Sequence, residues 1–143
     1  MEKHAILEAI RGYKPDNARS EIIKKNAVTI ILDAYNANPD SMKVALESLA
    51  DQNGTTVAIL GDMNEVEHSD ESHLEVLELA SSLGIDTVLT VGQKIGRVAS
   101  PAQHFDSKLD LENHLENLDF SGKTVLLKAS RSIKLETVVK SIA

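Results

Sequence analysis

Residues 28–33 read VTIILD, an almost wholly apolar run that ends on the carboxylate of Asp33. So apolar a run is typical of a strand in a parallel sheet that is buried on both faces. Three further runs share this composition and a fifth is shorter and weaker: residues 55–60 (TTVAIL), 86–91 (DTVLTV), 123–128 (KTVLLK) and 103–106 (QHFD). The sequence therefore predicts a buried and mostly parallel sheet.

Segments with apolar residues at three- and four-residue spacing separate these runs, and this spacing predicts helices. They are residues 39–49, 70–83, 108–118 and 133–142. Asn38 before Pro39 is a typical helix start, and Gly84 follows a predicted helix end. Strands that alternate with helices predict an α/β domain with helices on both faces of the sheet. Residues 19–25 are predicted to pair with 28–33 as an antiparallel edge strand.

The composition excludes several classes of protein. The 143 residues suit one globular domain, and 15 Lys and Arg against 22 Asp and Glu give a net charge of -7 without a basic face for nucleic acid. The absence of cysteine excludes thiolate metal sites and disulfides, and it favours a cytoplasmic location. No apolar run approaches the roughly 20 residues of a membrane span. We expect neither nucleic acid nor a membrane as partner.

Polar side chains follow three of the predicted strands. Ligands of open parallel sheets bind outside the carboxyl ends of the strands, so these side chains predict a site. Each alone is better explained by a helix cap or a turn, and only their number favours a site. The candidates are Asp33, Tyr35, Asn36 and Asn38 after the first strand, Asp62 after the second, and Lys128, Ser130 and Arg131 after the last.

Two other patterns carry no site. Residues 121–124 read SGKT, like the end of a phosphate-binding P-loop, but the required earlier glycine is Asn117 and a strand follows instead of a helix. His68 and His73 stand five residues apart, which places them on different faces of a helix and excludes a shared zinc ion. We expect the five histidines to be solvated and no metal ligands to be present.

Several motifs, in the same order along the chain, resemble those of the Mur ligase family. Residues 33–42 read DAYNANPDSM and resemble the family pattern DxYNANPxSM; residues 60–63 read LGDM, with His73 in the next helix; and residues 126–131 read LLKASR, with Glu136 downstream. Arg19 aligns with the arginine that opens the third domain of the family. The YNANP run is that of the members that add D-alanyl-D-alanine.

The resemblance implies a Rossmann-like, three-layer domain that is the C-terminal third of a longer ligase. Residues 1–18 would be a hinge helix and linker from a missing central ATPase domain, and residues 19–143 the C-terminal domain. The family reaction phosphorylates a carboxylate of UDP-MurNAc-tripeptide with ATP, and the amine of D-Ala-D-Ala then forms the amide. ATP and Mg²⁺ would be bound mainly by the central domain, with the missing N-terminal and central domains as partners in cis.

The resemblance also implies roles for the polar loops. The nucleotide-binding residues would be Arg19, Asp33, Tyr35, Asn36 and Asn38, and the substrate-binding residues Asp62, Lys128, Ser130 and Arg131. Without a P-loop, we expect the chain alone to be inactive. Two alternatives remain: a stand-alone module that binds a small anion or nucleotide, and the C-terminal domain of a folylpolyglutamate synthetase-like enzyme, against which the YNANP run argues.

Overall fold

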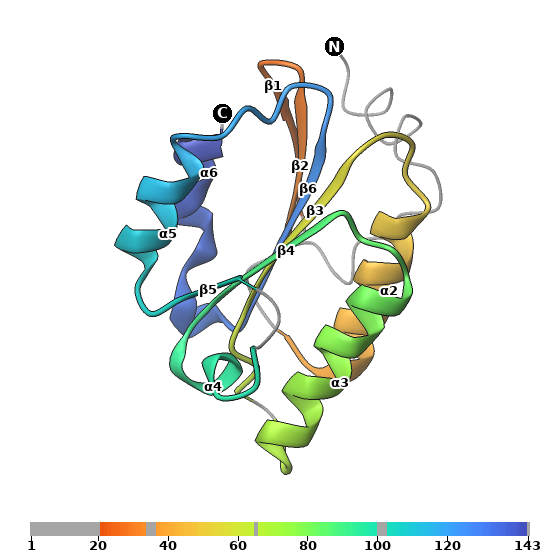
Figure 1. Ribbon diagram of the computed structural model, residues 1–143, viewed down its shortest axis with the longest axis vertical. Coiled ribbons are helices and arrows are strands. Elements are labelled where there is room, and N and C mark those ends of the chain that lie inside the picture. The colour runs from red at the N-terminus through yellow and green to blue at the C-terminus, as the bar shows by residue number, and fades with distance from the viewer. Residues whose placement is uncertain (1–20, 34–36, 65, 100–102, 143) are drawn as a thin grey trace.

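The computed structural model describes residues 21–33, 37–64, 66–99 and 103–142. The strands form one six-stranded sheet in the order β1-β2-β6-β3-β4-β5 (Figure 1). β1 runs antiparallel to β2, and the other neighbouring strands are parallel. The strands are β1 (Glu21–Lys25), β2 (Val28–Asp33), β3 (Thr56–Gly61), β4 (Thr87–Val91), β5 (Gln103–Phe105) and β6 (Thr124–Lys128). The predicted mostly parallel sheet with an antiparallel edge strand is confirmed.

Helices cover both faces of this sheet (Figure 1). α2 (Pro39–Ala50) and α3 (Ser69–Ser82) lie on one face, and α5 (Lys108–Leu115) and α6 (Val139–Ile142) lie on the other. The short α4 (Gln93–Gly96) follows β4 at the edge where the parallel strands end. The predicted three-layer α/β architecture is therefore confirmed.

The core has two halves because successive residues of a strand face opposite sides of the sheet. Ile31 of β2 belongs to the same apolar cluster as Leu46 of α2, whereas its neighbour Ile30 belongs to the cluster of Leu111 in α5. All four side chains are fully buried. Each contributes about 1.5–3 kcal/mol by leaving water, and together the two clusters fix the sheet between its helices.

The C-terminal segment corrects one prediction. In place of a single helix over residues 133–142, the structure has two 3₁₀ turns, η1 (Arg131–Ile133) and η2 (Leu135–Val138), before α6. Lys134 between them has a φ of 56°, a left-handed conformation that no helix can continue through. Lys108 donates to the carbonyl of Lys134 and to the hydroxyl of Thr137, which ties this break to the beginning of α5.

Two smaller differences concern the helices. α5 ends at Leu115 instead of residue 118, and α4 was not among the predicted helices. The SGKT run forms the turn into β6, with Gly122 at a φ of 77° and its N–H donating to the carbonyl of Ala27. The interpretation of this run as a turn is confirmed. In the described part of the chain, no helix has the length and apolar character needed to cross a membrane.

Candidate functional site

Four parallel strands, β2, β6, β3 and β4, end side by side, and the loops that follow them form the candidate site. Asp33 of β2 is in register with Lys128 of β6, and Gly61 of β3 with Val91 of β4. This end of the sheet lies at the bottom of Figure 1, next to α4. We call it the carboxyl edge, and it comprises Asp33, Lys128 and residues 62–64, 92–95 and 130–132.

A buried ion pair lies at the centre of the carboxyl edge. The Lys128 ammonium donates to Asp33 Oδ2 at 2.6 Å, and the two side chains are 0% and 5% exposed. Charges this deeply buried are tolerated only as a pair. Lys128 was predicted to bind substrate and Asp33 to bind nucleotide. The structure joins the two side chains in one ion pair.

The loop after β3 is tied to the loop after β6 by three hydrogen bonds. The N–H of Ser130 donates to the carbonyl of Asp62 at 2.8 Å, and the N–H of Asn64 donates to Ser130 Oγ at 2.7 Å. The side-chain amide of Asn64 also donates to Ser132 Oγ at 2.7 Å. The predicted residues Asp62 and Ser130 are therefore in direct contact, and Asn64 is a neighbour that the sequence reasoning did not select.

The carboxylate of Asp62 ties the same loop to the one after β4. Its Oδ1 accepts from the N–H of Ile95 at 2.8 Å, and only 7% of the residue is exposed. Gly92 packs so closely against it that an added Cβ would lie 2.4 Å from Oδ1. Gly92 also has a φ of 126° and a ψ of 162°, a conformation that is essentially restricted to glycine. The close approach and the backbone both require glycine here.

His73 of α3 fixes the loop after β3 through a hydrogen bond to the backbone of Met63. It is fully buried in α3; its Nε2 accepts from the N–H of Met63 at 2.8 Å, and its Nδ1 donates to the carbonyl of Ser69 at 2.6 Å. The expectation that the histidines are solvated is wrong for this one. The sequence held the signal, because His73 stands three and four residues before the buried Val76 and Leu77.

The remaining predicted residues lie around this centre or outside the described residues. Asn38 caps α2 as predicted, since its side chain accepts from the N–H of Ser41 at 2.9 Å. Arg131 is exposed at the beginning of η1. Arg19, Tyr35 and Asn36 lie outside the described residues, as does the predicted hinge over residues 1–18.

A pocket of about 360 Å³ opens at the carboxyl edge. It is lined by Asp62, Val91, Gly92, Gln93, Lys94, Asp106, Lys108, Ser132 and Ile133. Lys94 and Lys108 come from the beginning of α4 and α5, and sequence reasoning missed both. Lys94 had a detectable signal, because it stands three residues after a predicted strand; Lys108 had none, since only the fold brings it here.

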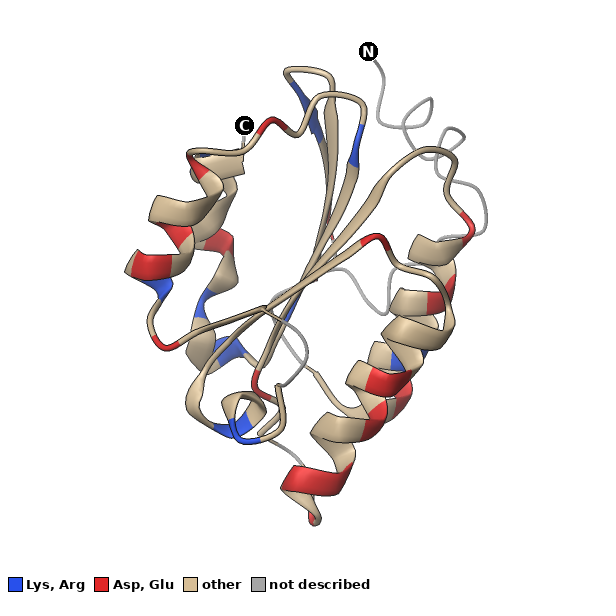
Figure 2. Ribbon diagram, in the orientation of Figure 1, with Lys and Arg blue, Asp and Glu red and all other residues tan. Residues whose placement is uncertain are grey.

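Charge is distributed unevenly over the described part of the molecule. Basic segments gather around α4, η1 and the beginning of α5, whereas acidic residues mark the outer surface of α3 (Figure 2). At the beginning of α3, the hydrogen bond and the charge of Arg97 lower the pKa of the exposed Asp70 carboxyl. Among the described residues, no group of three or more His, Asp or Glu side chains is placed to hold a metal ion.

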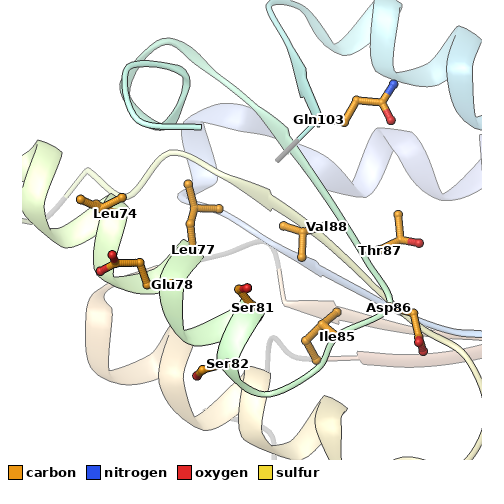
Figure 3. A pocket seen from close by; sticks show the side chains of 10 residues that line it. All are labelled: Leu74, Leu77, Glu78, Ser81, Ser82, Ile85, Asp86, Thr87, Val88 and Gln103. Atoms are coloured by element: carbon orange, nitrogen blue, oxygen red, sulfur yellow. The ribbon is translucent and has the colours of Figure 1, made fainter. Parts of the chain in front are cut away.

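A second and larger hollow, of about 590 Å³, runs along α3 and over the beginning of β4 (Figure 3). We call it the α3 groove, and it is lined by Leu74, Leu77, Glu78, Ser81, Ser82, Ile85, Asp86, Thr87, Val88 and Gln103. Its Asp86 accepts hydrogen bonds from the N–H and the hydroxyl of Thr56, so this carboxylate fastens β3 to the loop before β4. None of the predicted site residues that the structure describes lines it.

The chain resembles known ligases over most of its length. It is 38% identical over 116 residues to the UDP-N-acetylmuramoyl-tripeptide–D-alanyl-D-alanine ligase of Escherichia coli, with 77% of this chain and 26% of that protein covered. The ligase of the same name from Bacillus subtilis is 36% identical, with 94% of this chain and 32% of that protein covered. The chain thus spans about a quarter to a third of these relatives.

Solved structures and a family match agree with this. The crystal structure of a MurF ligase from Thermotoga maritima in complex with ADP is 27% identical and superposes with a TM-score of 0.77, covering 92% of this chain and 31% of that one. Residues 18–131 match the glutamate ligase domain of the Mur ligases. This match and the identity to the curated ligases show that the chain belongs to the Mur ligase family.

Proposed function

We propose that the chain is the C-terminal domain of an ATP-dependent ligase that adds D-alanyl-D-alanine to UDP-MurNAc-tripeptide, in the cytoplasm, during the synthesis of peptidoglycan precursors. The observation that carries the proposal is the 38% identity to a ligase of that name, together with a carboxyl edge on which the matching motifs meet. The relatives described above are ligases of this kind. They favour the proposed ligase over the two alternatives, a stand-alone binding module and a folylpolyglutamate synthetase-like domain.

The missing two thirds of such a ligase would supply the N-terminal and central domains in cis. The P-loop and the Mg²⁺ site belong to the central domain in this proposal, and ATP supplies the phosphoryl group that activates the carboxylate of the tripeptide. The described residues contain no P-loop of their own, since the SGKT run is a turn before β6. The chain alone is therefore expected to make no product.

The residues after β2 would contact the nucleotide when the domains close. Asp33 lies at the end of β2, and Asn38 stands at the beginning of α2 with its amide oxygen used for the cap. A carboxylate can accept from ribose hydroxyls, and the amide NH₂ of Asn38 has no hydrogen bond to a described residue. Arg19, Tyr35 and Asn36 are proposed for the same role from their motifs.

The residues after β3 and β6 would bind the incoming dipeptide. Asp62 and Arg131 lie at the carboxyl edge as candidate contacts, whereas Lys128 and Ser130 hold Asp33 and Asn64. We assign Lys128 and Ser130 a positioning role in the substrate site. Closure of this edge over the reacting groups would bring the amine close to the activated carboxylate and exclude water.

The test is amide formation by the protein made from the full reading frame that contains this chain. With ATP, Mg²⁺, UDP-MurNAc-tripeptide and D-Ala-D-Ala, we expect the pentapeptide product and one phosphate released for each amide. The chain alone, under the same conditions, is expected to give neither. A full-length protein that binds ATP but joins no dipeptide to the tripeptide would contradict the proposal.

A further inference from the structure

The pocket at the carboxyl edge is lined by one buried acidic group and two basic groups. The hydrogen bonds between the loops leave these three groups with capacity for further hydrogen bonds. It lies between the loops after β3, β4 and β6 and the beginning of α5. Its volume of about 360 Å³ is near the lower limit for small-molecule sites, which run from about 300 to 1,000 Å³. Such a pocket suits a ligand of few atoms.

Asp62 supplies the acidic pole. One oxygen of its carboxylate, Oδ1, accepts from Ile95, and the other, Oδ2, has no hydrogen bond to any described residue. The residue is only 7% exposed. A carboxylate removed from water in this way gains free energy from a donor, and a cationic donor gives the strongest hydrogen bond. The acidic pole therefore fits an ammonium group.

Lys94 and Lys108 supply the basic pole. The Lys94 ammonium donates to Asn64 Oδ1 at 2.9 Å, and the Lys108 ammonium donates to the carbonyl of Lys134 at 3.3 Å and to Thr137 Oγ1 at 3.0 Å. These acceptors are neutral, and neither lysine forms an ion pair with a carboxylate of the described residues. Asp106 also lines the pocket, but it lies 3.3 Å from His104 and its side chain is 96% exposed.

We propose that this pocket is the seat of a short zwitterionic peptide, with the ammonium at Asp62 and the carboxylate at Lys94 and Lys108. An extended dipeptide spans about 7 Å, a length that a pocket of about 360 Å³ can hold. The inference rests on the proposed function and deepens it, since D-Ala-D-Ala carries both charges. Lys94 and Lys108 become specificity-determining residues that select a ligand with a free carboxylate.

The experiment compares D-Ala-D-Ala with its C-terminal amide as substrates of the full-length ligase. The wild type is expected to have a KM about tenfold or more lower for the dipeptide than for the amide, because the amide lacks the charge that Lys94 and Lys108 would bind. Lys94→Ala and Lys108→Ala each raise the KM for the dipeptide about tenfold and reduce this preference, while the KM for ATP stays unchanged. Lys24→Ala, on exposed β1, is the matched control.

Asp62→Asn tests the acidic pole with a side chain of the same shape. It keeps an oxygen for the N–H of Ile95, removes the negative charge, and is expected to raise the KM for the dipeptide with no change in the KM for ATP. If this variant does not fold, the lysine variants decide. Lysine variants that keep the normal KM and the preference over the amide would overturn the inference. A wild type that forms no amide at all would instead overturn the proposed function.

Discussion

The carboxyl edge and the α3 groove differ in size and in chemistry, and the smaller of the two is the better candidate site. The groove has about 590 Å³ and the edge pocket about 360 Å³. At the edge, however, loops from three strands are joined through Asp62, Asn64 and Ser130, and buried charges face one another. In the groove, the half-buried beginning of β4 meets α3, and Asp86 of the groove is engaged with Thr56. Convergent polar groups identify the site better than volume does.

The largest effect expected at the carboxyl edge is that of Lys128→Ala. The change leaves the Asp33 carboxylate buried without its ion-pair partner and should lower the free energy of unfolding by about 3–5 kcal/mol. Urea denaturation measures the loss, with Lys24→Ala as the exposed control. The double variant Lys128→Met, Asp33→Asn should be more stable than Lys128→Ala, because it removes the buried negative charge together with its partner. A double variant no more stable than Lys128→Ala would contradict the ion pair between Lys128 and Asp33.

The next effect separates two glycines with positive φ. Gly92→Ala combines a conformation that costs about 1–3 kcal/mol for a side chain with a clash against Asp62. Gly84→Ala, at a φ of 77° with nothing within 4 Å of the new Cβ, has only the backbone cost. Thermal denaturation of both variants should show the larger decrease in Tm for Gly92→Ala. Equal decreases would mean that Asp62 is not packed against Gly92.

A third comparison concerns the two histidines at the beginning of α3. His73→Leu removes the acceptor of the Met63 N–H and leaves that donor buried, which should cost about 1–3 kcal/mol of stability. His68→Leu, an exposed residue without a capping hydrogen bond, should stay within about 0.5 kcal/mol of the wild type. Chemical denaturation measures both. A His73→Leu protein as stable as His68→Leu would contradict the buried role of His73.

The smallest effect expected is pH dependent and involves Asp70 beside Arg97. Arg97 lowers the pKa of this carboxyl in the folded state. The pair therefore contributes its stability above the pKa of the unfolded chain, which is about 3.9. The contribution is lost as the pH falls through the lowered folded pKa. The wild type should exceed Arg97→Ala in stability at neutral pH, by little because the pair is exposed, and the two should converge in acid. A difference that grows in acid would contradict this assignment.

The sheet and much of the candidate site could be predicted from the sequence. The apolar runs gave the strands because burial on both faces permits little else, and Asn38 gave the beginning of α2 through its side-chain chemistry. The break at Lys134 was missed because a left-handed lysine has no local signature, and its hydrogen bonds come from Lys108, far away in the chain. Only the fold brings Lys94 and Lys108 to one pocket.

The most direct test of the carboxyl edge as the ligand-binding face is a titration of the labelled chain with D-Ala-D-Ala, followed by backbone amide shifts in NMR spectra. We expect shifts at Gly92, Lys94 and Ser132 and unchanged signals from Leu77 and Val88 in the α3 groove. Shifts confined to the groove, or an edge that stays unchanged at the solubility limit of the dipeptide, would contradict the account.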